Sequence, residues 1–145
     1  MSRPMESEPA RLDCRAHSVA VQTADFDTAY TFYTTVLGLR TVREPFLFKT
    51  RTLAWLDGGG VLIELFSMKK GHTSFPYTDV NLGLTHIAFE VPDLDEAIEL
   101  CKQHNVPITQ GPMTPPSGDP LQPRVLFVEG PDGQAIQLRE PRRDE

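Results

Sequence analysis

Four polar residues that can bind metal ions occupy matching places in the two halves of this chain. His17 and His86 each precede a short apolar run, and their residue numbers differ by 69. Glu64 and Gln137, which are 73 residues apart, each stand between two apolar residues in a segment of the form G-x-x-I-[E/Q]-L. Imidazole nitrogens and carboxylate or amide oxygens are all ligands of divalent metal ions. The pattern predicts two related modules that meet at a single chemical site.

The alternation of side chains along a strand indicates where these groups point. Glu64 lies between Ile63 and Leu65, so if the apolar neighbours face the helices, the carboxylate faces the other side of the sheet. Burying an unpaired carboxylate is very costly, and a metal ion would supply its partner. Two imidazoles, one carboxylate and one amide oxygen suit one divalent ion per site (Zn, Ni, Co, Mn or Fe) with positions open for water or substrate. Each residue taken singly is more often structural, so the prediction depends on the repeat.

Each half of the chain has the periodicity of one helix and four strands. The predicted strands of the first half cover 16–21, 40–48, 50–56 and 61–66. Those of the second half cover 84–91, a segment near 106–110, 124–128 and 135–138. The first helix is predicted to begin after the N-cap Asp25 and to end before Gly38, and the second begins after Asp93. Each half therefore reads as a βαβββ unit.

The prolines are concentrated in the second half. The segment from Gly111 to Pro123 contains five of the 13 prolines in the chain. Proline has no N–H for a ladder or a helix interior, so this segment is predicted to be a long loop. Long ordered loops in small domains are often functional, which makes this one a candidate pocket wall or lid.

The domain organisation follows from the repeat. Residues 1–14 are polar and are predicted to be a flexible N-terminal arm, and residues 141–145 a tail. Between them, residues 15–140 form a single α+β domain made of modules 15–68 and 84–140. One unit of this size would have a marginal core alone, so the modules are expected to share a core, within one chain or in a dimer.

The chain resembles the vicinal oxygen chelate (VOC) superfamily, which includes glyoxalase I, methylmalonyl-CoA epimerase, extradiol dioxygenases and fosfomycin resistance proteins. The resemblance covers residues 15–140 and lies in His17…Asp25-Phe26-Asp27, Val36-Leu37-Gly38-Leu39, Ile63-Glu64-Leu65, Gly83-Leu84-Thr85-His86-Ile87 and Gly130-Pro131-Asp132-Gly133…Ile136-Gln137-Leu138. It implies a cupped mixed β-sheet around a divalent metal. His17, Glu64 and His86 fall on the family's metal-ligand positions, and Gln137 replaces the usual glutamate.

The resemblance implies several reactions, and Gln137 bears on the choice because an amide cannot take a proton. Glu64 is then the only carboxylate of the four and the candidate base. A metal-dependent isomerase or epimerase would remove the proton next to a metal-chelated carbonyl of a small oxygenated metabolite, such as a sugar-like ketone of secondary metabolism. His72 and Tyr77 are weak candidates for a second acid or base. The alternatives are a lyase of the glyoxalase I type, an Fe(II) ring-cleaving dioxygenase and a non-catalytic antibiotic-binding protein.

Other residues are weaker candidates for substrate binding. Arg51 and Trp55 share one face of their predicted strand, and Phe66 follows the Ile-Glu-Leu segment. Either Arg51 or Arg124 could reach an anionic or hydroxylated substrate, although an ion-paired surface arginine is the more common case. By analogy with relatives of this size, the protein is also expected to form a homodimer.

Composition narrows the remaining classes. With 39% hydrophobic and 23% charged residues, the chain has the mix of a soluble globular protein. Its net charge of −6 disfavours nucleic acids and anionic membrane surfaces as partners, and no apolar run approaches the ~20 residues of a membrane span. Because the N-terminus has no signal-like apolar region, the cytoplasm is the expected compartment, with Cys101 a buried apolar residue.

Overall fold

The computed structural model describes residues 9–69, 71, 82–114 and 123–141. The elements of the first half are β1 (Ser18–Thr23), α1 (Phe26–Thr31), the π-helical turn η1 (Phe32–Val36), β2 (Arg40–Phe48), β3 (Arg51–Asp57) and β4 (Leu62–Ser67). Those of the second half are β5 (Ile87–Glu90), α2 (Leu94–Gln103), β6 (Ile108–Met113), β7 (Val125–Glu129) and β8 (Ala135–Arg139). The predicted βαβββ order is therefore present in both halves.

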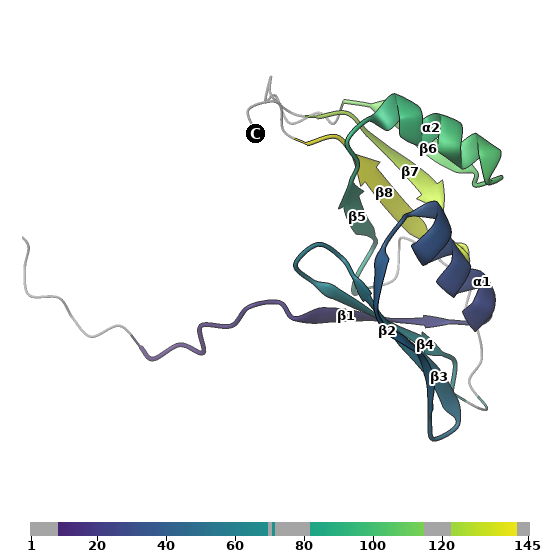
Figure 1. The fold of residues 1–145 in the computed structure, drawn as a ribbon. Coiled ribbons are helices and arrows are strands. Elements are labelled where there is room, and N and C mark those ends of the chain that lie inside the picture. Colours follow the sequence, from purple (N-terminus) through teal and green to yellow (C-terminus); the bar gives the residue numbers. More distant parts are fainter. Residues whose placement is uncertain (1–8, 70, 72–81, 115–122, 142–145) are drawn as a thin grey trace, which may run out of the picture.

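Each half builds its own four-stranded mixed sheet (Figure 1). The strand orders are β1-β4-β3-β2 and β5-β8-β7-β6. In both sheets the first and last strands of the module pair in parallel, and the other neighbours are antiparallel. The α+β fold with two modules is confirmed, and among the described residues the expected sheet consists of two separate sheets.

Both helices begin at the predicted caps. The Asp25 carboxylate accepts a hydrogen bond from the backbone N–H of Thr28 at 3.1 Å, and Asp93 accepts one from Glu96 at 3.1 Å. The Thr28 N–H holds the pKa of Asp25 below its ordinary value, because the bond favours the charged carboxylate. The φ angle of Gly38 is +76°, a left-handed conformation that suits the glycine predicted to end the first helix.

Among the described residues, no helix has the length and apolar character needed to cross a membrane.

The proline-rich segment departs from the prediction at its start. The long loop expected from residue 111 begins later, because β6 continues through Gly111 and Pro112 to Met113. This strand lies at the edge of its sheet, where a proline without an N–H is tolerated. Gly111 is required by a close approach, since a Cβ there would lie 2.8 Å from the carbonyl oxygen of Val125. The rest of the predicted loop falls mostly on residues 115–122, outside the described residues.

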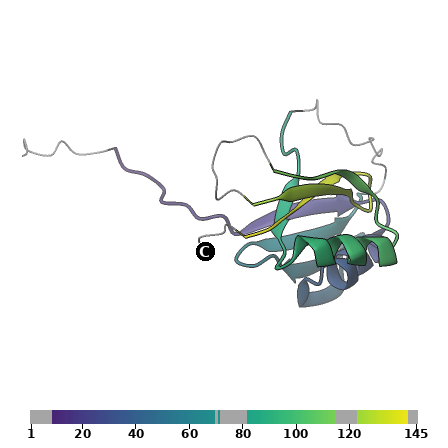
Figure 2. The same cartoon turned by 90° about the horizontal axis from the view of Figure 1, so that it is seen from above.

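One hydrophobic core joins the two modules. It contains Ala29, Phe32, Tyr33, Leu56, Ile63, Leu65, Leu94, Cys101, Leu126, Val128, Ile136 and Leu138. Figures 1 and 2 show both helices on one side of the molecule, beside the two sheets. Two hydrogen bonds also cross between the modules, from the Ala24 N–H to Asp132 at 2.9 Å and from the Gln134 amide to the Tyr33 hydroxyl at 3.5 Å. Burial raises the pKa of Tyr33 to about 12, because an apolar environment disfavours the phenolate.

The shared core makes a prediction about stability. Leu65 is fully buried, so Leu65→Ala should lower the free energy of unfolding by about 2–5 kcal/mol. Because its cluster includes residues of both modules, calorimetry should still show a single unfolding transition at a lower temperature. Leu47, which is 73% exposed, is the matched control, and Leu47→Ala should change stability by less than about 0.5 kcal/mol. Two separate transitions, of which only one shifts, would contradict a shared core.

Candidate metal and substrate site

Glu64 and Gln137 lie on the faces of the two sheets that point away from the shared core. Their neighbours Ile63, Leu65, Ile136 and Leu138 all belong to the core, so alternation turns the polar side chain of each strand outward. We call these outward faces the open faces of the two sheets. In the first sheet, Glu64 is flanked across the strands by Ala20 and Trp55. In the second sheet, Gln137 is flanked by Ala88 and Phe127.

The strand pairings define which residues of the two modules are equivalent. Ala20 is the partner of Glu64, and Ala88 is the partner of Gln137. If Glu64 corresponds to Gln137, then Ala20 corresponds to Ala88, and the residue numbers in the first strands differ by 68. The strand register therefore fixes an offset one residue shorter than the offset between His17 and His86.

By this register, Ser18 corresponds to His86, and His17 stands one residue earlier. The Ser18 hydroxyl donates a hydrogen bond to Oε1 of Glu64 at 2.8 Å, which places both side chains on the same open face. A slip of one residue along a strand moves a side chain to the opposite face. The sequence already indicates that Ser18 corresponds to His86 when residues are counted back from the helix caps. Ser18 precedes Asp25 by seven residues, and His86 precedes Asp93 by the same number.

His17 lies just before β1, where the backbone is irregular and its side chain is exposed. Its ring lies edge-on to Trp55, with the ring centroids 6.1 Å apart. Since Trp55 is the cross-strand partner of Glu64, His17 remains close to the open face of the first sheet although it is out of register.

His86 lies close to Gln137 on the second sheet. Its ring lies edge-on to Phe127 at 5.1 Å, and Phe127 is the partner of Gln137. Its Nδ1 is 3.0 Å from the Thr85 hydroxyl. In the tautomer with the proton on Nδ1, the ring donates a hydrogen bond to that hydroxyl and Nε2 carries a lone pair that could bind a metal. Metal-bound histidines usually make such a second contact through their other ring nitrogen.

The four predicted ligands do not meet as one cluster in the described part of a single chain. No group of three or more His, Cys, Asp or Glu side chains placed to hold a metal occurs there. The contacts described above place Glu64 with Ser18 in one module and His86 beside Phe127 in the other. Each module thus carries part of the predicted ligand set on its own open face, and we call these two parts the half-sites.

Three of the predicted substrate-binding residues share the open face of Glu64. Arg51 lies over the ring of Phe66, with its guanidinium carbon 4.6 Å from the ring centroid. It also donates to the Ser67 carbonyl at 3.0 Å and to the Gln22 side chain at 2.8 Å. With Trp55 beside Glu64, these contacts give the first half-site an aromatic and cationic wall.

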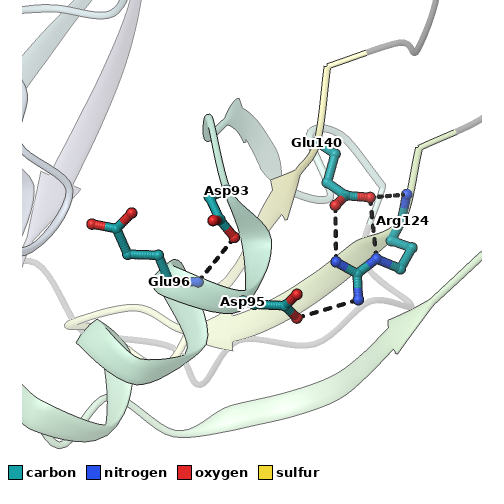
Figure 3. A network of polar contacts seen from close by, with 5 residues as sticks. All are labelled: Asp93, Asp95, Glu96, Arg124 and Glu140. Atoms are coloured by element: carbon teal, nitrogen blue, oxygen red, sulfur yellow. Dashed lines mark hydrogen bonds and ion pairs between the residues drawn. The ribbon is translucent and has the colours of Figure 1, made fainter.

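Arg124 has a different environment (Figure 3). Its guanidinium forms a two-pronged ion pair with Glu140, at 3.2 and 2.9 Å, and a third contact with Asp95 at 3.3 Å. These carboxylates raise the pKa of Arg124 above its ordinary value. The neighbouring Val125 pairs with Arg139 on the open face, so Arg124 points to the other face, toward α2. The structure thus shows an ion-paired arginine that joins the last strand to α2.

Two further regions bear on the site. His72 and Tyr77, the candidates for a second acid or base, lie outside the described residues.

A cavity of about 750 Å³ opens between the modules, and its lining residues include Leu39, Asp57, Phe89, Glu96 and Leu100. None of the four predicted metal ligands lines it, so this cavity is separate from both half-sites.

Comparison with known proteins identifies the class. The family model of the Glyoxalase/Bleomycin resistance protein/Dioxygenase superfamily matches residues 15–138, and the chain belongs to this superfamily. The uncharacterized protein YaeR of Escherichia coli (strain K12) is 28% identical over 136 residues, which cover 87% of this chain and 95% of that protein.

Solved structures show the same fold. The trypanothione-dependent glyoxalase I of Leishmania major is 27% identical, with a TM-score of 0.67, over 88% of this chain and 87% of that one. A glyoxylase/bleomycin resistance protein/dioxygenase domain from Frankia sp. EAN1pec is 20% identical, with a TM-score of 0.71, over 93% and 96% of the two chains.

The register of β1 generates a prediction about metal affinity. Ser18→His would place an imidazole at the position equivalent to His86, beside Glu64. We expect this variant to bind Zn²⁺ at least about tenfold more tightly, which is about 1.4 kcal/mol, in competition with a chromogenic chelator. His17→Ala should weaken binding less than His86→Ala does, because His17 is out of register. The opposite pattern, no gain at Ser18 and equal losses at the two histidines, would show that His17 is the ligand that the first module supplies.

Proposed function

We propose that the protein is a metal-dependent enzyme that moves a proton next to a carbonyl of a small oxygenated metabolite, with Glu64 as the base. The observation that supports this most directly is the placement of Glu64. It is a half-buried carboxylate on an open face, and no cation pairs with it among the described residues. An isomerase or epimerase is the reaction we favour.

The donor chemistry fits one divalent ion per site. His86, Glu64 and Gln137 would hold it, and His17 would be a fourth ligand from outside the strand register. When bound, such an ion makes the hydrogen next to a chelated carbonyl more acidic. Zn, Ni, Co, Mn and Fe all accept this mixture of nitrogen and oxygen donors, so the residues do not select one of them.

The side chains around Glu64 suit proton transfer. Ser18 donates to Oε1, which fixes the carboxylate and leaves Oε2 as the oxygen that can take a proton. Trp55 is the cross-strand partner of Glu64, so an apolar ring lies beside the carboxylate. Gln137, at the matching place in the second sheet, would bind the ion through its amide oxygen, and an amide takes no proton.

A lyase of the glyoxalase I type is the second candidate. It is favoured by the 27% identity to a protein described as a trypanothione-dependent glyoxalase I. The proton transfer would be the same, and the substrate would be an adduct between a thiol and a 2-oxoaldehyde. The two candidates differ in whether turnover needs a thiol.

The arrangement of the half-sites supports a homodimer with shared sites. Glu64 and Gln137 point away from the common core on two different sheets. In a dimer, the second sheet of one protomer could therefore lie against the first sheet of the other. Each complete site would then combine Glu64 of one protomer with His86 and Gln137 of the other.

The proton-transfer role can be tested by isotope exchange. Glu64→Gln keeps the shape of the side chain and removes its basicity, so exchange of the α-hydrogen of dihydroxyacetone with D₂O should fall at least about 100-fold, in line with the usual contribution of a general base. NMR spectroscopy of the metal-loaded protein would follow the exchange. Exchange without a thiol supports the isomerase, and exchange of methylglyoxal only when a thiol is present supports the lyase. Full exchange by Glu64→Gln would exclude this residue as the base.

Shared sites can be tested by mixing two inactive variants. Refolding Glu64→Ala together with His86→Ala should produce mixed dimers with one intact site, and should restore part of the metal binding measured by calorimetry. The matched control is the double variant Glu64→Ala/His86→Ala refolded alone, which should restore none. No recovery in the mixture would show that each site is built within one chain.

A further inference from the structure

Within the described ranges, two buried hydrogen-bond donors on the open faces have no acceptor. Trp55 Nε1, Arg139 Nε and Asp132 Oδ2 are the buried side-chain polar atoms without a hydrogen-bond partner among the described residues. The first two are donors, and they lie one on each open face, since Trp55 pairs with Glu64 and Arg139 follows Gln137 by two residues. Buried donors are normally satisfied, so each such group requires an explanation.

Arg139 differs from the other arginines whose contacts the structure describes. Arg40 pairs with Asp57, Arg124 pairs with Glu140, and Arg51 donates to the chain around it. Arg139 forms no ion pair or side-chain hydrogen bond among the described residues. This unneutralised guanidinium is nevertheless half-buried. A charge in such a place is costly unless an anion accompanies it.

The neighbours of Arg139 hold it in place without neutralising it. On the neighbouring strand β7, its cross-strand partner is Val125, which is only 3% exposed and lies outside the shared core. On the other neighbouring strand, β5, its partner is Glu90, an exposed residue with which it forms no ion pair. The guanidinium therefore lies on the open face, and its buried Nε donor has no acceptor among the described residues.

Arg139 also lies at a useful distance from Gln137. Two residues along a strand span about 6.6 Å, and the side chains of both residues leave the same face. A small molecule whose carbonyl oxygens lie near Gln137 and His86 could therefore place an acidic group, one or two carbons further on, at Arg139. This geometry matches a short substrate with a charged end.

We propose that Arg139 binds an anionic oxygen of the substrate, a carboxylate or a phosphate, and that the substrate is therefore a small organic acid or phosphate ester with neighbouring oxygens. Arginine is permanently charged, and the Nε edge of its guanidinium binds two anionic oxygens at once. Trp55 Nε1 would supply a second donor only where two half-sites meet, as the proposed homodimer requires. The location of the reacting carbons rests on the proposed function, whereas anion binding at Arg139 does not.

Titration of the metal-free full-length chain with anions tests the proposal. In ¹⁵N-labelled protein, inorganic phosphate and malonate, added in separate experiments, should shift one arginine Nε–H signal in a saturable way. Arg139→Lys should remove that signal. Arg139→Gln should weaken binding of the preferred anion at least about tenfold by calorimetry. The anion that binds more tightly distinguishes a phosphate from a carboxylate substrate.

Arg40→Gln is the matched control, because it removes the same charge at a residue that is 71% exposed and paired with Asp57. Its anion affinity should equal that of the natural protein. Equal affinity in Arg139→Gln would overturn the proposal. So would an Nε–H signal that ignores both anions but moves in Glu90→Gln, since this would place Arg139 in an internal ion pair. The titration uses neither metal nor turnover, so its outcome is independent of the Glu64 experiments.

Discussion

The structure depends on one constraint: two strands must bury apolar residues on one face while each carries a single polar residue between them. In β4 and β8, the residues on either side of Glu64 and Gln137 enter the same core, together with residues of α1 and α2. Because strand side chains alternate, burying the neighbours forces both polar groups outward. The shared core thus determines where the side chains of Glu64 and Gln137 lie, as well as the fold.

Sequence patterns predicted the features that depend on neighbouring residues. The caps Asp25 and Asp93, the order of the elements and the outward direction of Glu64 all follow from local spacing, and the structure agrees. The extension of β6 to Met113 was not predicted, because glycine and proline suggest a loop and only the edge position of the strand makes them acceptable. The partners of Arg124 come from α2 and from the end of β8, so tertiary packing alone brings them together.

The two half-sites have become chemically unequal. The first offers a carboxylate held by a serine hydroxyl, with an indole ring beside it. The second offers an imidazole, an amide and a guanidinium whose Nε has no acceptor among the described residues. In the proposed reaction, the first sheet would handle the proton and the second would bind and orient the substrate. Arg139 could not be singled out from sequence, because only the structure shows that it forms no ion pair within the described part of the chain.

The hydrogen bond between Ser18 and Glu64 also has an evolutionary consequence. A duplicated module can diverge through a change in length as well as by substitution. Removing Ser18 would bring His17 next to Val19, into the strand position that His86 has in the other module. A single codon gained or lost would therefore exchange a hydroxyl for an imidazole beside Glu64. An alignment that pairs the two histidines by residue type would conceal such a change, whereas one that pairs the strands would show it.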